Sequence, residues 1–465
     1  MAGDALAFAT IRELGRQLRA GETTPTELVD YYSDRLETVG RRLNAVVTMT
    51  RERAFREARL AEAELKAGYD RGPLHGIPYG AKDLLATAGI PTTWGAAPLQ
   101  DQVFPEDATV VRRLRDAGAV LVAKLAMVEL AGGMGYSQPN ASLTGPGVNP
   151  WNLDAWSGGS SSGSGSAVGG GCVPFAIGSE TWGSIMTPAS YCGVAGLRPT
   201  YGRVSRHGAM ALCWTLDKLG PLGRTADDCG LVLAAMAGPD AADPSTLAEA
   251  YRYVPPDSER TSGFRLGVLR EGLEQMQPGV RDAFEASLVS LAEIATLEDV
   301  ELPDLPYGDA TTIILRAEAT AAMEDLLASG ALAGLTAPED RIGGYQGFTV
   351  SAVDYLRAMR IRRHARAALD LVFTRFDAIV CPTTGLVASP LSARFDDYAG
   401  RLRRMSAGAA GNLAGLPSVS VPNGFGERGL PTGLQLIGRA GGENALLAVA
   451  RAYQGRTDWH LRRPA

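Results

Sequence analysis

Several patterns that would define other classes of protein are scarce or missing from this chain. The four histidines, at positions 75, 207, 364 and 460, form no HxxxH or HxH pair, and the five cysteines have no CxxC spacing. The sequence therefore predicts neither a zinc site nor a disulfide framework. No run of 18 or more apolar residues occurs, so no membrane-spanning helix is predicted. We expect a protein with no metal, no cofactor and no membrane span.

Signals for export and for nucleic-acid binding are also missing. The first residues show no charged segment followed by an apolar one, so no secretory signal is predicted. Five cysteines without a pairing pattern fit reduced thiols in a cytoplasmic protein. The net charge is −6 and the basic residues are scattered, which gives no electrostatic reason to expect nucleic acid as a partner.

Lysine is the scarcest charged residue. The chain has four lysines, at positions 66, 82, 124 and 218, and the remaining 41 of its 45 basic residues are arginines. Lysine can lose its proton when it is removed from water, whereas arginine cannot. Genome composition is the alternative explanation for the imbalance. Sequence context singles out Lys82 among the four.

Lys82 follows a short apolar segment between glycine and proline residues. Residues 75–81 (HGIPYGA) are typical of a short buried strand, which would place Lys82 at its end. A desolvated ammonium group has a lowered pKa, and this is how proteins turn a lysine into a general base. The alternative is a surface lysine paired with Asp83, which the apolar LLATAGI that follows argues against.

The stretch from Ser157 to Thr200 is the most informative in the sequence. Its glycine- and serine-rich first half passes into the apolar run CVPFAIGS and then into a second turn, which predicts a loop, a buried segment and a loop. Ser160 and Ser184 stand one in each loop. A GxSxG match centred on Ser161 is expected by chance in so serine-rich a run, and no P-loop or SxxK motif occurs. A serine–lysine system remains as the predicted chemistry.

Longer motifs then indicate a family. The stretch contains GGSS, GSETWGSI and PASYCGVAGLRPT, and it is preceded by GPLHGIPYGAKD and followed by NLAGLPSVSVP. These motifs, in this order, resemble those of the amidase signature family over most of the chain. The resemblance implies one α/β domain over residues 1–465, a twisted mixed β-sheet surrounded by α-helices. Its signature core would span about 72–225, with a surface excursion at about 237–262.

The resemblance also implies roles for particular residues. Ser184 matches the nucleophile, Ser160 the serine on a cis peptide bond that relays the proton, and Lys82 the neutral base. The predicted oxyanion hole consists of the backbone N–H groups of Thr181, Trp182, Gly183 and Ser184. The predicted substrate-binding residues are Gly132, Gly133, Met134, Ser161 and Trp182.

Three positions depart from the family pattern. Trp182 stands where a glycine is usual, Glu180 replaces the commoner aspartate, and Met186 stands where arginine is frequent. The Trp182 ring either lines the acyl pocket, and so changes the shape of substrate accepted, or packs outward as part of the core. Neither alternative affects the predicted serines and lysine.

The resemblance implies a serine hydrolase that cleaves the C–N bond of linear amides through an acyl-enzyme, with carbamates, as in a urethanase, or aryl esters as further substrates. The expected partners are a small-molecule amide or carbamate and no nucleic acid, for a monomer or homodimer. The alternative function is the glutaminase subunit of a tRNA-dependent amidotransferase, which YGRVSRHG favours. Met405 argues against it, because family members that bind glutamine place an acidic residue there.

Overall fold

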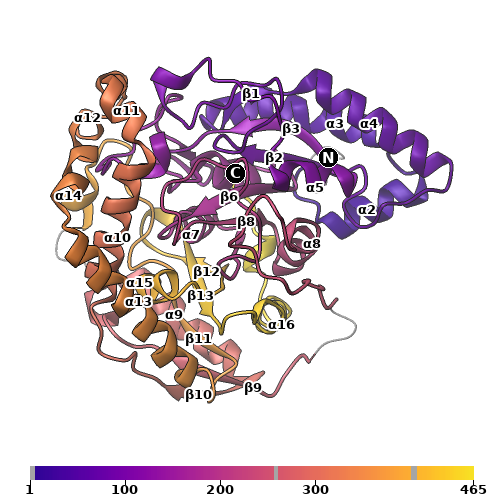
Figure 1. Ribbon diagram of the computed structural model, residues 1–465. Helices are drawn as coiled ribbons and strands as arrows, with labels where there is room; N and C mark the ends of the chain where they lie inside the picture. Colours follow the sequence, from indigo (N-terminus) through magenta and orange to yellow (C-terminus); the bar gives the residue numbers. More distant parts are fainter. Residues whose placement is uncertain (1–5, 256–259, 400–405) are drawn as a thin grey trace.

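An eleven-stranded mixed sheet forms the centre of the protein. The computed structural model describes residues 6–255, 260–399 and 406–465, and within them the strand order is β1-β3-β2-β6-β8-β7-β12-β13-β11-β9-β10 (Figure 1). A separate two-stranded sheet pairs β4 with β5. The strands are β1 (Val46–Met49), β2 (Pro78–Lys82), β3 (Val120–Leu125), β4 (Val148–Asn149), β5 (Asn152–Trp156), β6 (Phe175–Glu180), β7 (Ala195–Arg198), β8 (Lys218–Gly223), β9 (Phe264–Val268), β10 (Ala295–Asp299), β11 (Ala378–Pro382), β12 (Ser418–Phe425) and β13 (Pro431–Ile437).

Both strand directions occur in the large sheet. Strands β3, β2 and β6 are parallel neighbours, and β9 is parallel to both β11 and β10. The remaining neighbours are antiparallel. The parallel neighbours β2 and β3 are connected through α5 (Thr109–Asp116), and β9 and β10 through α9 (Pro278–Ala292), whereas the antiparallel strands β12 and β13 follow each other after a short connection. The predicted α/β fold with a mixed sheet is confirmed.

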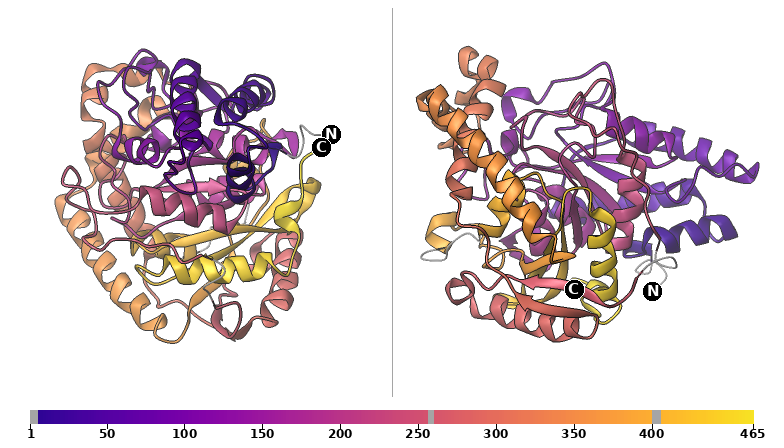
Figure 2. Two further views of the ribbon diagram at one scale, coloured as in Figure 1. Left: turned by 90° about the vertical axis from the view of Figure 1, so that its right-hand side faces the viewer. Right: turned by 60° about the horizontal axis from the view of Figure 1, so that its bottom comes forward.

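Helices cover the sheet on both faces. In Figure 1, α7 lies to one side of the central strands, and α8 and α16 lie to the other. The N-terminal helices and the group around α10 and α13 lie at opposite sides of the sheet (Figures 1 and 2). The helices are α2 (Ile11–Ala20), α3 (Pro25–Arg35), α4 (Arg51–Lys66), α5 (Thr109–Asp116), α6 (Ser162–Gly169), α7 (Met186–Cys192), α8 (Ala226–Met236), α9 (Pro278–Ala292), α10 (Tyr307–Ala322), α11 (Glu324–Ser329), α12 (Asp340–Gly343), α13 (Ala352–Val372), α14 (Phe395–Ala399), α15 (Ser406–Leu413) and α16 (Glu443–Gln454).

The glycine- and serine-rich segment differs from the loop that its composition predicts, and it forms the helix that the family resemblance implied after GGSS. Most of the predicted loop is the buried helix α6, which packs against α7 and β6. A Cβ atom on Gly163 would lie 2.5 Å from both the Ala126 nitrogen and the Ala45 oxygen. Each glycine lowers helix propensity by about 1 kcal/mol. Here the close approach of backbone to backbone outweighs that cost, which local sequence does not reveal.

Two further expectations concern long segments. Across the described ranges, no helix has both the length and the apolar character needed to cross a membrane. Residues 237–262, predicted as a surface excursion, contain no α-helix or β-strand in their described part. Within this segment, Asp240 accepts hydrogen bonds from the hydroxyls of Thr109 and Ser205, each at 2.6 Å, which ties the loop to the body of the protein. The domain limits of 1–465 stay a prediction.

The packing of α6 predicts opposite effects for two helical glycines. Gly163→Ala should lower the free energy of unfolding by about 2–4 kcal/mol, because the new methyl group meets backbone atoms that cannot move aside. Gly308→Ala in α10 meets no atom within 4 Å. It should leave stability unchanged or raise it by up to about 1 kcal/mol. Urea unfolding of both variants tests this, and equal effects would contradict it.

Candidate active site

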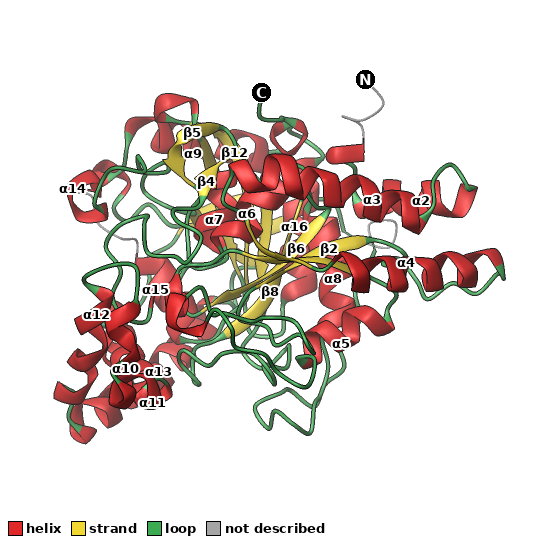
Figure 3. Cartoon of the chain, turned by 90° about the horizontal axis from the view of Figure 1, so that it is seen from above, coloured by secondary structure: helices red, strands yellow, loops and turns green. Residues whose placement is uncertain are grey.

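The candidate site lies where two parallel strands end. Lys82 is the last residue of β2 and Glu180 the last of β6, and these strands are parallel neighbours, so their carboxyl ends meet at one edge. Ligands in open α/β sheets bind outside this edge. Helix α6 begins just after Ser160, and helix α7 begins just after Ser184. The two helices lie over the central strands in Figure 3.

Lys82 is fully buried and contacts two serines. Its Nζ donates to Ser160 Oγ at 2.7 Å and to Ser179 Oγ at 2.9 Å. Burial lowers the pKa of Lys82 to about 7, although the carboxylates of Asp217 and Glu180 act in the opposite direction. The alternative of a surface pair with Asp83 is wrong, because Asp83 instead pairs with Lys124 at 2.9 Å in the interior.

The two predicted serines lie on neighbouring turns. The Gly159–Ser160 peptide bond is cis, as the resemblance implied. The backbone oxygen of Ser184 accepts a hydrogen bond from the Ser161 nitrogen at 3.3 Å, so the two turns are joined. Ser184 is 9% exposed, and within the described residues no hydrogen bond reaches its hydroxyl. The Ser184 hydroxyl therefore has no fixed hydrogen-bond partner among the described residues.

The turn between β6 and α7 presents backbone N–H groups. Gly183 has φ of +88°, a conformation that glycine adopts without strain. In the described part of the chain, the N–H groups of Gly183 and Ser184 donate to no acceptor. The Glu180 carboxylate stabilises the turn by accepting hydrogen bonds from the backbone nitrogens of Ile185 and Met186, at 2.8 and 3.0 Å. Unpaired N–H groups of this kind can stabilise an oxyanion.

Glu180 belongs to a buried network of charges. Its Oε1 accepts hydrogen bonds from Arg198 at 2.7 Å and from Asn412 at 3.0 Å. Burial alone would raise the pKa of Glu180, but the charges of Arg198 and Lys218 and the hydrogen bonds from Arg198 and the Met186 nitrogen bring the pKa to about 2. The carboxylate is therefore ionised and fixed beneath the Ser184 turn.

A pocket of about 550 Å³ opens beside the two serine turns. Gly159, Trp182 and Gly183 form part of its lining, so it reaches the neighbours of both serines. Trp182 lines this pocket and also packs against the hydrophobic core, so it has features of both sequence-based alternatives, and an effect on the shape of substrate accepted stays a prediction. An aromatic cluster forms another part of the wall, namely Tyr136, Trp156, Tyr191 and Phe395.

Four predicted substrate-binding residues lie apart from this pocket lining. Met134 is 1% exposed, and a Cβ on Gly344 would lie 2.6 Å from its sulfur, so Met134 packs against that segment. Gly132 and Gly133 directly precede Met134 in the chain. Ser161 is buried, and its hydroxyl donates to the Ser179 oxygen at 3.1 Å. A role for these four residues in substrate binding stays a prediction.

Sequence reasoning missed three residues that contact the site. Ser179 binds Lys82, the Asp217 carboxylate accepts from Thr181 Oγ1 at 2.6 Å, and Lys218 Nζ lies 3.5 Å from the Thr181 oxygen. Burial lowers the pKa of Lys218 to about 7, as it does for Lys82. The scarcity of lysine was a signal that could have identified Lys218.

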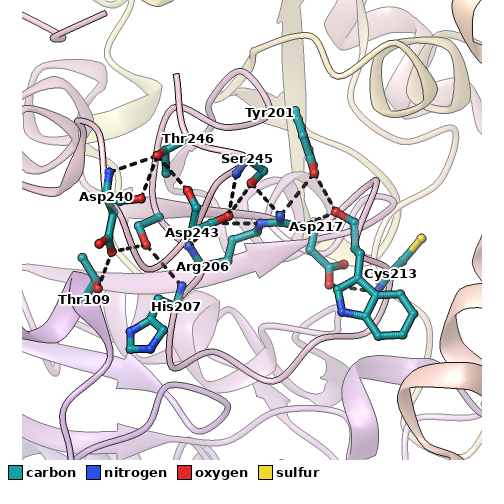
Figure 4. Close-up of polar contacts among 12 residues, drawn as sticks. Thr109, Tyr201, Arg206, His207, Cys213, Asp217, Asp240, Asp243, Ser245 and Thr246 are labelled. Atoms are coloured by element: carbon teal, nitrogen blue, oxygen red, sulfur yellow. Dashed lines mark hydrogen bonds and ion pairs between the residues drawn. The ribbon is translucent and has the colours of Figure 1, made fainter. Parts of the chain in front are cut away.

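A second cavity lies on the other side of the β6 end. It has a volume of about 220 Å³, and Ser179, Thr181 and Asp217 are among its lining residues. Successive side chains of a strand point to opposite faces, which explains why Ser179 lines this cavity while Glu180, the last residue of β6, lines the larger one. Figure 4 shows the polar contacts along this side, from Asp217 past Arg206 to Asp240. In residues 6–255, 260–399 and 406–465, no three His, Cys, Asp or Glu side chains are grouped to hold a metal ion.

The fold and the site together define a class of protein: an α/β protein with a buried lysine–serine contact at the carboxyl ends of parallel strands. Serine–lysine pairs of this kind occur in hydrolases of unrelated folds. Comparison with known proteins is more specific. A family model described as Amidase matches residues 27–447. The chain therefore belongs to the amidase signature family, and at this level it is a hydrolase of carbon–nitrogen bonds.

Individual relatives resemble the chain along its whole length. The A subunit of glutamyl-tRNA(Gln) amidotransferase from Moorella thermoacetica is 39% identical, over 99% of each chain. The solved structure of native peptide amidase from Stenotrophomonas maltophilia is 33% identical, with a TM-score of 0.86 over 98% of each chain. The solved A subunit of glutamyl-tRNA(Gln) amidotransferase from Thermotoga maritima is 29% identical, with a TM-score of 0.77 over 96% of this chain and 94% of that chain.

These relatives correct one expectation. A small-molecule amide or carbamate as sole partner, without nucleic acid, was wrong, because relatives aligned end to end are named as subunits of an enzyme that acts on a tRNA. The net charge of −6 could not reveal this. Bulk charge describes direct contact with nucleic acid, and it carries no information about contact made by another subunit of an assembly.

The buried pair of Glu180 and Arg198 predicts a large loss of stability when one charge is removed. Glu180→Gln should lower the free energy of unfolding by about 3–5 kcal/mol, because the Arg198 charge remains buried without its partner. Urea unfolding measures the effect. Glu285→Gln, in the exposed pair with Arg270, is the matched control and should change stability little. A change in Glu180→Gln as small as in this control would contradict the prediction.

Proposed function

We propose that Ser184, Ser160 and Lys82 hydrolyse an amide C–N bond through an acyl-enzyme. The observation that carries the proposal is the 2.7 Å contact between the fully buried Lys82 amine and Ser160 Oγ. Burial lowers the pKa of Lys82 to about 7, which leaves a large fraction of the amine neutral at neutral pH and able to accept a proton.

The reaction then has a balanced sequence of proton transfers. Ser184 Oγ attacks the amide carbon, its proton passes to Ser160 Oγ, and the Ser160 proton passes to Lys82 Nζ. The N–H groups of the 181–184 turn stabilise the oxyanion that forms on the amide oxygen. The C–N bond breaks when the leaving nitrogen takes a proton back through Ser160. Water, activated by the same route, then hydrolyses the ester on Ser184.

We infer that this chemistry releases ammonia from glutamine in a tRNA-dependent amidotransferase. The support is that the relatives named as the A subunit of glutamyl-tRNA(Gln) amidotransferase align over 98–99% of this chain. Met405, which argued against this function, lies outside the described residues. Asp396 lines the pocket and is a carboxylate that can accept a hydrogen bond from the substrate's ammonium group.

A second candidate function is an amidase that works without other subunits on amides with bulky apolar acyl groups. The observation that favours it is the aromatic wall of the pocket, where the rings of Trp156 and Phe395 stack with centroids 4.6 Å apart. Aromatic side chains of this kind provide a large apolar contact area. The similarity to the peptide amidase of Stenotrophomonas maltophilia agrees with this candidate.

Substrate assays with a nucleophile variant distinguish the two candidates. The purified chain is given L-glutamine with hydroxylamine, which traps the acyl-enzyme as a γ-glutamyl hydroxamate, and separately an aromatic N-acyl 4-nitroanilide. Ser184→Ala should lower kcat for whichever of the two substrates the wild type cleaves by about 10⁴–10⁶-fold, since the serines and the lysine act together and fail without the nucleophile. Ser164→Ala is the matched control, because Ser164 is a buried serine of α6 that donates to the Ile177 oxygen. Hydroxamate formation supports the amidotransferase function, whereas cleavage of the anilide alone supports the second candidate.

The pKa of Lys82 predicts the pH dependence. Below pH 7 the amine is protonated and cannot accept the Ser160 proton, so kcat/KM should fall about tenfold per pH unit and level off above pH 7. Lys218 titrates in the same range, because burial also lowers its pKa to about 7. The acid limb should therefore persist in Lys218→Gln. Its loss in that variant, or a flat profile from pH 5.5 to 8.5 in the wild type, would show that Lys82 is not the base.

A further inference from the structure

Asp217, directly before β8, and Lys218, the first residue of β8, both bind Thr181. The Thr181 hydroxyl donates to Asp217 Oδ1 at 2.6 Å, and Lys218 Nζ lies 3.5 Å from the Thr181 backbone oxygen. Strand β8 is antiparallel to β6, and Lys218 lies opposite Glu180 in their register. The residue that follows β6 is therefore next to the residues that begin β8, so these contacts follow from the strand pairing.

Asp217 is itself fixed on its other side. Its Oδ2 accepts hydrogen bonds from the backbone nitrogens of Leu212 and Cys213, both at 2.8 Å, and the carboxylate is buried. Its own nitrogen donates to the Cys213 oxygen at 2.9 Å, which closes a tight turn. Figure 4 shows Asp217 and Cys213 side by side at one end of the polar contacts. A carboxylate with both oxygens engaged cannot follow Thr181 if Thr181 moves.

Lys218 is equally constrained. It is 2% exposed, and its Nζ donates to Asn412 Oδ1 at 2.9 Å and to the Leu216 oxygen. Asn412 in turn donates to Glu180, the residue that stabilises the Ser184 turn. The ammonium group is thus held between the Thr181 oxygen and a side chain that is already part of the buried network. No step of the proposed reaction uses Lys218 as a base or a nucleophile.

The contact with the Thr181 oxygen bears directly on the oxyanion hole. A trans peptide group is planar, and its C=O and N–H point in opposite directions. The oxygen of Thr181 and the N–H of Trp182 belong to one such group. A donor that holds the oxygen on the Lys218 side therefore directs the N–H of Trp182 to the opposite side.

We propose that Asp217 and Lys218 are positioning residues that orient the Thr181–Trp182 peptide group, so that the Trp182 N–H points to the oxyanion. The inference rests on the proposed function of Ser184. It adds that a pair of residues outside the substrate pocket sets the geometry of one oxyanion donor. The pair acts through Thr181 and does not touch the substrate.

Two pairs of variants test the proposal, each with a conservative partner. Thr181→Val removes the hydroxyl and Thr181→Ser keeps it, while Lys218→Met removes the donor and Lys218→Gln keeps an N–H group. We expect the wild type to cleave glutamine or the anilide, and kcat and KM of each variant are measured with that substrate. Thermal unfolding of all four variants establishes that they are folded.

The expected result is a split between kcat and KM. Complete loss of one oxyanion donor lowers kcat by about 10²–10³-fold. A misdirected donor should cost less, so Thr181→Val and Lys218→Met should each lower kcat by about 10–100-fold. KM should stay within about twofold, because the oxyanion exists only in the transition state. Thr181→Ser and Lys218→Gln should retain most of the wild-type kcat.

Other results would overturn the proposal. Wild-type kcat in both Thr181→Val and Lys218→Met means that the contacts do not orient the donor. Equal losses within each pair, accompanied by a raised KM, mean that these residues only support packing. A fluorophosphonate probe separates these outcomes from failure of the proposed function. Absence of an adduct on Ser184 of the wild type, read by peptide mass spectrometry, overturns both proposals. Adduct formation at the same rate in wild type and in all four variants overturns only the positioning role.

Discussion

Burial of the Lys82 amine is the constraint on which the candidate site depends. A lysine at the surface is charged at neutral pH and cannot accept a proton, whereas burial lowers the pKa of Lys82 to about 7. A buried amine must also keep hydrogen-bond partners, and the hydroxyls of Ser160 and Ser179 provide them. The parallel pairing of β2 and β6 brings these groups together, because it places the ends of both strands at one edge.

The same burial explains the charges around the site. Glu180 and Arg198 form an ion pair in the interior, and Glu180 also binds the backbone of the Ser184 turn. Breaking such a pair would leave a buried charge without a partner, which is costly. The Glu180 carboxylate therefore keeps its position, and the turn that it binds is held in place. Preorganised donors are effective in catalysis because they need no rearrangement during the reaction. The network that stabilises the fold therefore also fixes the geometry of the Ser184 turn.

The sequence predicted those features that depend on local pattern and on family motifs. The strand before Lys82, the two serine turns and the mixed sheet were all found in this way. Local composition did not predict the helical state of α6, which only the family resemblance implied, because Gly163 is needed for close contacts with Ala45 and Ala126, which are distant in sequence. Ser179 and Asp217 were missed for a similar reason: their contacts depend on which strands are neighbours. The nucleic-acid expectation failed because net charge describes one chain and not an assembly.

The distribution of lysine makes sense in the light of these contacts. Of the four lysines, Lys66 is exposed on α4, while the other three are buried in a chain with about ten times as many arginines. Lys124 pairs with Asp83, and the contacts of Lys82 and Lys218 are with hydroxyl, amide and carbonyl groups. A guanidinium stays charged wherever it is placed, but an amine can be buried in neutral form. A lysine at position 82 therefore fits the need for a removable proton in the interior, whereas Lys218 acts as a hydrogen-bond donor to the Thr181, Leu216 and Asn412 oxygens.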